Sequence, residues 1–371
     1  MLSSLNAPAA SLVKPATSAA PARGRAVISK AQGSAQQKEL QLIGPEPQRF
    51  AVAKGQLTTI ASAAFPFLMR LGSGGFVSGY SVSLVKDDGK YAMLEGLGRK
   101  MREESAALSG FNRPQQPITL YEFEGCPFCR KVREAVNILD LDVLFKPCPK
   151  DGPNWRPEAN QKGGKRMFPY MVDDNTGTAM YESDAIISYL FNTYGDGKVP
   201  LGLRLGPLTA ISCGLAMLPR ALKGSAYTPS KLPEQPLVYW GYEASPFCKV
   251  VREKLCELEL PHIQRSCARG SPKRQELYER RGRFQARSLV CCHTLPQVRA
   301  GGQLVSPPAA PVLTFCGFWG LSEQPVLARF CLPLTASLHS RLQAPYLEDP
   351  NTGKAMFESA SIIQTRMLCE L

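Results

Sequence analysis

Two cysteines two residues apart are the groups in this sequence best suited to chemistry. Cys126 and Cys129 stand in the segment Cys-Pro-Phe-Cys, between an apolar run and an amphipathic stretch. At the start of a helix, the partial positive charge of the N-terminus favours a thiolate over a thiol. A second cysteine one turn later can then resolve a mixed disulfide. The pattern predicts thiol–disulfide exchange, with Cys126 as nucleophile and Cys129 as resolving thiol, and we expect Arg130 and Lys131 to favour the thiolate further.

The same element returns in the second half of the chain with one change that matters for chemistry. Ser245 takes the place of the first cysteine and Cys248 that of the second. The two copies cannot share one activity, because serine lacks the sulfur that attacks a disulfide. An ordinary helix cap is the simplest interpretation of Ser245, and we interpret Cys248 as an inert thiol.

The residues around these motifs predict the order strand, helix, strand, helix, hairpin, helix in each copy. Residues 118–123 are rich in β-branched and aromatic side chains, which favours a strand. Pro127 suits the first turn of a helix, where its missing N–H has no intrahelical partner. Residues 141–145 predict a second strand, residues 173–177 a hairpin turn and Ser183 the cap of the last helix. The same succession of residues returns downstream, which indicates a duplication.

Three features together resemble the thioredoxin-like fold, specifically glutaredoxins and the N-terminal domain of glutathione S-transferases. They are the Cys-Pro-Phe-Cys turn, a proline that opens the third strand and a Glu-Ser pair that opens the last helix. In that family the proline is cis and faces the active cysteine, and the Glu-Ser pair holds the γ-glutamyl end of glutathione. A free helix N-terminus also suits a carboxylate on physical grounds. The resemblance implies that glutathione contacts these residues of the first copy: Arg130, Phe168, Pro169, Glu182 and Ser183.

The resemblance extends to a second site that we expect to be degenerate. Its matching positions are Ser245, Cys248, Pro345, Glu358 and Ser359. Two interpretations of Ser245 stay open: it donates a hydrogen bond to a bound glutathione thiolate, as in serine-type transferases, or it only caps its helix.

We expect an α/β protein with two tandem thioredoxin-like domains, the second interrupted by an insert and truncated. The first stretch of the chain is basic and rich in Ala and Ser, with no acidic residue before Glu39, which is typical of a transit peptide. The whole layout also resembles a plant and algal group of tandem glutaredoxin/transferase-like proteins, which favours the chloroplast, with the mitochondrion as the alternative. The expected boundaries are 1–38 for the transit peptide, 39–117 for a region with a short apolar helix, 118–197 for the first domain, 198–235 for a linker with an apolar helix and 236–371 for the second domain.

The second copy contains a segment, residues 286–344, without a counterpart in the first. This segment is nearly uncharged, is broken by prolines and stands directly before the strand-opening Pro345. We interpret it as the translation of a retained intron. We therefore expect the second domain to fold less well than the first.

Composition disfavours several other classes of protein. The net charge is +13, but part of it belongs to the leader and the rest is scattered, so nucleic acid is not an expected partner. No run of apolar residues is long enough to predict a membrane span. The sequence has only three histidines, none near Cys126, which disfavours a zinc site or a Ser/His triad.

The leading hypothesis is a glutathione-dependent thiol–disulfide oxidoreductase of the glutaredoxin type. Glutathione would be its co-substrate, and protein or small-molecule disulfides its partners. A glutathione transferase is the first alternative, although residues 198–235 are too few for the helical domain that the family uses to bind the electrophile. A non-catalytic protein that binds glutathione or an iron–sulfur cluster is the second, because a thiolate and glutathione can together ligate a cluster.

Overall fold

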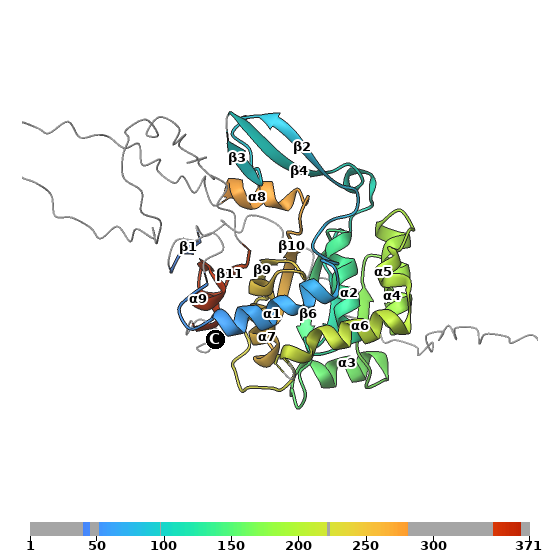
Figure 1. The fold of residues 1–371 in the computed structure, drawn as a ribbon. Coiled ribbons are helices and arrows are strands. Elements are labelled where there is room, and N and C mark those ends of the chain that lie inside the picture. The colour runs from blue at the N-terminus through green and yellow to red at the C-terminus, as the bar shows by residue number, and fades with distance from the viewer. Residues whose placement is uncertain (1–39, 45–51, 97, 221–222, 281–343, 365–371) are drawn as a thin grey trace, which may run out of the picture. The chain divides into compact units, whose positions relative to one another are not determined.

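A nine-stranded sheet organises the part of the chain that the computed structural model describes, residues 40–44, 52–96, 98–220, 223–280 and 344–364 (Figure 1). Its strand order is β1-β12-β11-β9-β10-β6-β5-β7-β8, and a separate sheet has the order β2-β4-β3. The strands are β1 (Gln41–Leu42), β2 (Tyr80–Lys86), β3 (Leu94–Gly96), β4 (Arg99–Ser105), β5 (Ile118–Glu122), β6 (Asp142–Pro147), β7 (Tyr170–Asp173), β8 (Thr178–Met180), β9 (Leu237–Gly241), β10 (His262–Ser266), β11 (Tyr346–Asp349) and β12 (Lys354–Phe357).

Helices cover the large sheet. They are α1 (Leu57–Met69), α2 (Pro127–Ile138), α3 (Trp155–Gly163), α4 (Ser183–Tyr194), α5 (Leu201–Arg204), α6 (Pro207–Met217), α7 (Pro246–Glu257), α8 (Lys273–Arg280) and α9 (Ser359–Gln364), with short 3-10 turns η1 (Leu108–Gly110) and η2 (Leu218–Arg220). Among the described residues, none of these helices has the length and apolar character needed to cross a membrane.

The first half of the chain folds in the order β5, α2, β6, α3, β7, β8, α4. β5 runs parallel to β6 and antiparallel to β7, which makes a mixed α/β layer. The apolar face of α2 packs on this sheet because its apolar residues recur at helical spacing. Val132, Ala135, Val136 and Leu139 are all buried there.

The second half shows the same order of elements: β9, α7, β10, α8, β11, β12, α9. β9 is parallel to β10 and antiparallel to β11. Leu237, Tyr239, Val251, Leu255 and Leu347 are fully buried in its core. The tandem origin of the two halves, and the expectation that the second domain folds less well than the first, stay predictions.

The two halves meet where β6 pairs with β10 in antiparallel register, so that the sheet runs through both of them. Leu144 pairs with Ile263, and these two residues hold the same position in their respective copies. The helix that precedes each half packs against the other half: α1 packs against α7, and α6 packs against α2 (Figure 1). The expected leader, residues 1–38, lies outside the described residues, as does the expected insert except for Ala344.

Candidate functional site

Cys126 lies at the point where the loop after β5 enters α2. Its backbone is extended (φ −92°, ψ 121°), and it forms the N-cap of the helix with Pro127 in the first turn. The Cys126 sulfur accepts a hydrogen bond from the backbone N–H of Cys129 at 3.3 Å. The turn thus aims one of the helix's unpaired N–H groups at the sulfur, which is how an N-cap stabilises a negative charge.

The two thiols of the turn differ in acidity. A hydrogen bond from the Cys129 side chain lowers the pKa of Cys126, and the backbone N–H of Cys129 and the guanidinium of Arg133 add to it against the effect of burial. Burial raises the pKa of Cys129 well above its ordinary value, and the neighbouring Cys126 raises it further. The turn therefore pairs a more acidic thiol, Cys126, with a less acidic one, Cys129.

Arg133 is the cation that lowers the pKa of Cys126, whereas the two cations expected from the sequence, Arg130 and Lys131, are paired with acids. The Nζ of Lys131 bonds the Oδ1 of Asp184 at 2.6 Å and is buried, so it ties α2 to α4. Arg130 is also completely buried, with its Nη1 2.8 Å from Glu243 of the second half. Our prediction that Arg130 contacts glutathione is therefore wrong for this structure, because its position on α2 turns it toward the other half.

The loop before β7 faces the Cys126 turn. The Phe168–Pro169 peptide bond is cis, and the carbonyl oxygen of Phe168 lies 4.0 Å from the Cys126 sulfur. The Phe168 ring packs edge-on against Phe123, with ring centroids 6.1 Å apart. A backbone that approaches the sulfur this closely can line a groove for an extended thiol-containing peptide.

Glu182 and Ser183 lie at the start of α4. Ser183 is buried as the first residue of the helix. Glu182 is exposed, and its φ of +66° is a backbone conformation that residues other than glycine rarely adopt. The Glu182 side chain makes no capping hydrogen bond, so the first N–H groups of α4 lie beside an exposed carboxylate. Such an end can receive a ligand that carries both a carboxylate and an ammonium group.

Corresponding features recur around Ser245 in the second half. The Ser245 oxygen accepts a hydrogen bond from the N–H of Cys248 at 3.3 Å and caps α7. The Ala344–Pro345 peptide bond is cis, Glu358 has φ +66°, and Ser359 opens α9. The second turn thus has the geometry of the first with a hydroxyl in place of the Cys126 sulfur, and Cys248 is buried.

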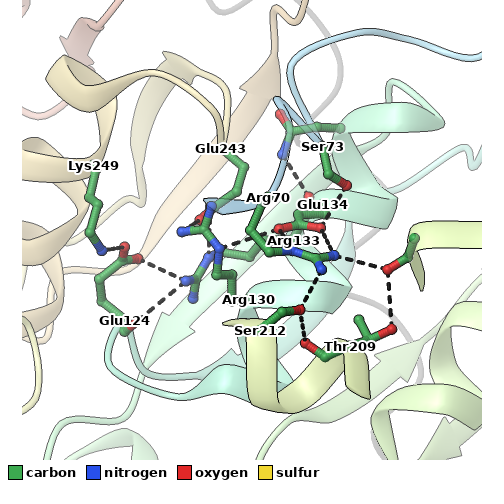
Figure 2. A network of polar contacts seen from close by, with 12 residues as sticks. Arg70, Ser73, Glu124, Arg130, Arg133, Glu134, Thr209, Ser212, Glu243 and Lys249 are labelled. Carbon is green, nitrogen blue, oxygen red and sulfur yellow. Dashed lines mark hydrogen bonds and ion pairs between the residues drawn. The ribbon is translucent and has the colours of Figure 1, made fainter. Parts of the chain in front are cut away.

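A buried network of charges joins the two turns, and sequence reasoning did not predict it (Figure 2). Glu124, two residues before Cys126, contacts the Nζ of Lys249 at 2.8 Å and the Nε of Arg252 at 3.2 Å, both on α7. Burial opposes ionisation of Glu124, but Arg133, Arg252 and Lys249 outweigh it and hold its pKa well below the usual range.

The reciprocal contact comes from Glu243, two residues before Ser245. Its carboxylate lies 2.8 Å from Arg130 and 2.9 Å from Arg133, both on α2. Each turn therefore carries a glutamate that neutralises cations on the other turn's helix. The signal in the sequence was the recurrence of Glu and Arg at matching positions of both copies, which we had interpreted only as evidence of duplication.

The network also includes an arginine directly after α1 and another after α6. The Nη2 of Arg70, directly after α1, lies 2.8 Å from Glu134, which also accepts a hydrogen bond from the Ser73 hydroxyl at 2.7 Å (Figure 2). Arg220 makes the corresponding ion pair with Glu253. Buried ion pairs of this kind fix how elements are matched more clearly than they add stability.

Comparisons with known proteins agree with this description of the first half. Residues 120–198 match the family model of the glutathione S-transferase N-terminal domain. A search of curated proteins gives no match.

Similar solved structures include a glutathione transferase of Bombyx mori, BmGSTD1, with 32% identity over 27% of this chain and 45% of that chain, at a TM-score of 0.22. The same Bombyx mori protein in complex with GTT has 31% identity over 27% and 46% of the two chains, at a TM-score of 0.21. A delta-class glutathione transferase of Nilaparvata lugens has 29% identity over 26% and 43%, at a TM-score of 0.20. The chain thus spans less than half the length of these proteins. The family match supports a thioredoxin-like fold of the glutathione transferase or glutaredoxin type, and a relation to glutathione.

Proposed function

We propose that the protein is a glutathione-dependent thiol–disulfide oxidoreductase of the glutaredoxin type. The observation that carries the proposal is the Cys126 sulfur at the N-cap of α2, with a lowered pKa and the Phe168 carbonyl 4.0 Å away. The Cys126 thiolate attacks the glutathione sulfur of a mixed disulfide, and the substrate leaves as a thiolate that takes up a proton. Two outcomes then regenerate the enzyme.

In the first outcome, a second glutathione thiolate attacks the mixed disulfide on Cys126 and leaves as oxidised glutathione. In the second, the Cys129 thiolate attacks Cys126, releases reduced glutathione and leaves an intramolecular disulfide that two further glutathione molecules reduce. The negative charge of Cys126 is one cause of the raised pKa of Cys129. Because a mixed disulfide removes that charge, Cys129 becomes easier to ionise only after the first attack.

The residues around the thiol suit glutathione as the co-substrate. The N-terminus of α4 and the Glu182 carboxylate can hold the γ-glutamyl carboxylate and ammonium groups. The backbone beside Pro169 can align the cysteinyl part with Cys126. In this proposal the second turn has no redox role, because Ser245 replaces the nucleophile.

The test is glutathione-coupled reduction of a small glutathione mixed disulfide by the full chain. We expect Cys126→Ser to abolish the reaction and Cys129→Ser to retain it, because a second glutathione can resolve the mixed disulfide. Full activity in Cys126→Ser would overturn the proposal. The full chain is the appropriate material because the sheet and the charge network span both halves.

A glutathione transferase is the second candidate: residues 120–198 match the N-terminal domain of that family, and Ser245, at the corresponding turn of the second half, is the residue type that serine-type transferases use. In that case Ser245 would hydrogen-bond the glutathione thiolate, and Ser245→Ala would lower conjugation of an electrophile such as chlorodinitrobenzene. Loss of conjugation in Ser245→Ala, with no disulfide reduction by the wild type, would select the transferase. Import into the chloroplast, or alternatively the mitochondrion, is a separate proposal that rests on residues 1–38, and a fluorescent fusion of that segment tests it.

A further inference from the structure

A pocket of about 440 Å³ opens beside the Ser245 turn, and neither the proposed chemistry nor the resemblance accounts for it. Four aromatic rings line it, together with Met93, Ala244 and Pro246. The rings belong to Phe67, Phe76, Tyr80 and Tyr242. Small-molecule sites typically have about 300–1,000 Å³ and mostly apolar walls, so this pocket has the size and lining of one.

The corresponding position in the first half differs. The pocket beside the Cys126 turn has about 170 Å³, and Gly214 and Met217 of α6 line it where Ala64 and Phe67 of α1 line the larger one. Each pocket lies between a turn and the helix packed beside it, α6 at Cys126 and α1 at Ser245, so the same kinds of element enclose both. Their lining side chains differ: three cationic side chains line the small pocket, and aromatic rings line the large one.

A three-stranded sheet, which has one copy among the described residues, builds part of the large pocket. Tyr80 opens β2 and Met93 precedes β3, in the three-stranded sheet that follows α1. In the second half, the described residues between η2 and β9 contain no such sheet. The extra sheet thus adds walls to the pocket at Ser245 and none to the pocket at Cys126.

One charged side chain, Arg269, lines this pocket among the described residues. Its Nη1 donates to the Oε1 of Glu103 at 2.9 Å, and the Tyr80 hydroxyl donates to the same oxygen at 3.0 Å. The Glu103 side chain is completely buried and holds the guanidinium at the pocket. A guanidinium has five N–H donors in a planar fork that matches a carboxylate, so Arg269 can still take an anionic group from a ligand.

We propose that this pocket binds a small aromatic carboxylate, with the ring among the aromatic side chains and the carboxylate on Arg269. A carboxylate can accept from the N–H donors of Arg269 that Glu103 does not take, which neither a cationic nor a purely apolar ligand can do. The Ser245 side chain is not part of the lining, so binding requires neither thiol chemistry nor glutathione. The inference therefore goes beyond the proposed oxidoreductase and can fail independently of it.

The experiment is a calorimetric titration of the full chain with 2-naphthoate. Ala64→Leu should fill the pocket from α1 and weaken binding by about tenfold or more, because an added side chain occupies the ligand's space. Gly214→Leu is the matched control: it fills the corresponding pocket beside Cys126 and should leave 2-naphthoate binding unchanged. The neutral analogue 2-naphthamide should bind the wild type about tenfold more weakly, because it cannot pair with Arg269. Cys126→Ser should bind 2-naphthoate like the wild type.

Three results would overturn the proposal: no saturable binding of 2-naphthoate, equal losses in Ala64→Leu and Gly214→Leu, or equal affinity for the acid and the amide. Competition by glutathione would also overturn it, since it would place the ligand at the glutathione site. Phe76→Ala provides a second variant if circular dichroism shows that Ala64→Leu does not fold. Phe76 is partly exposed, so its removal should weaken binding without opening the core.

Discussion

At the scale of single residues, the two thiols of the Cys126 turn differ in acidity, and the cations next to Cys126 in sequence do not explain its lowered pKa. Arg130 and Lys131 follow the motif directly, yet both are buried and paired with acids elsewhere. Arg133, one helical turn further, is the cation that favours the Cys126 thiolate. The partners that pair with Arg130 and Lys131 are Glu243 and Asp184, which are distant in sequence, so the sequence around the motif does not reveal these pairings.

The acidity of Cys126 gives the first prediction. Its pKa lies below the ordinary value, so the thiolate fraction, and with it the rate of iodoacetamide alkylation, should reach half its maximum at a lower pH than for a free cysteine. Cys148 is the internal control, because burial raises its pKa well above the usual range and should keep it slow. Mass spectrometry of alkylated peptides across a pH series measures both. Equal rates at Cys126 and Cys148 would contradict the assignment of the nucleophile.

Glu182 gives the second prediction. If its carboxylate pairs with the ammonium group of glutathione, Glu182→Gln should raise the KM for glutathione by about tenfold, since it removes one charge-assisted contact. The alkylation profile of Cys126 should not change, because the sulfur keeps its own hydrogen bonds. Glu358→Gln, at the corresponding position of the second half, is the control and should leave the KM unchanged. An unaltered KM in Glu182→Gln would make Glu182 an ordinary solvated acid.

At the scale of elements, the repeated order of strands and helices followed from apolar periodicity, turn residues and prolines, because those signals are local. The pairing of β6 with β10 did not follow, since a strand pattern does not name its neighbour. The sheet of β2, β3 and β4 was also missed, because we assigned only a short helix to residues 39–117. The packing of α1 on α7 and of α6 on α2 did not follow either, because it joins positions far apart in the chain that local patterns do not connect.

The cross-bridging glutamates give a third prediction. Glu243→Gln should lower the free energy of unfolding by about 3–5 kcal/mol, because it leaves Arg130 and Arg133 buried with less compensation. It should also shift the alkylation midpoint of Cys126 to lower pH, since a less neutralised Arg133 favours the thiolate more strongly. Glu253→Gln is the matched control: it breaks the pair with Arg220 and should destabilise without moving the Cys126 midpoint. Urea unfolding and pH-dependent alkylation separate the two effects, and identical midpoints in both variants would make Glu243 purely structural.

At the scale of the whole molecule, the two halves share one sheet and one buried network, so we expect neither to be an independent folding unit. Residues 40–198 alone would expose the β6 edge that β10 covers and would leave Arg130 and Arg133 without Glu243. An unpaired strand edge promotes association between molecules. We therefore predict that this fragment aggregates under conditions in which the full chain is monodisperse by light scattering. A soluble, cooperatively unfolding fragment would show that the halves are separable.

The connection that leads to β11 gives the last prediction. In the first half, residues 164–169 join α3 to β7, whereas residues 281–345 join α8 to β11. Deleting residues 286–344 leaves 281–285 and Pro345, the same number of residues as in the first half, between the same two kinds of element. We therefore expect the shortened protein to keep its melting temperature within a few degrees, because the entropy of closing a connection changes only slowly with its length.

Cys126 alkylation should also stay the same in the deletion variant, since the Glu243 contacts with α2 come from residues before the deletion. Deleting residues 164–168 of the first half is the contrast: it removes the Phe168 backbone beside Cys126 and should abolish the reaction. A transcript that lacks the codons for 286–344 would support the retained-intron interpretation. If removing residues 286–344 instead lowers the melting temperature sharply, the segment contributes to the folded protein, and an accidental translation product would not do so.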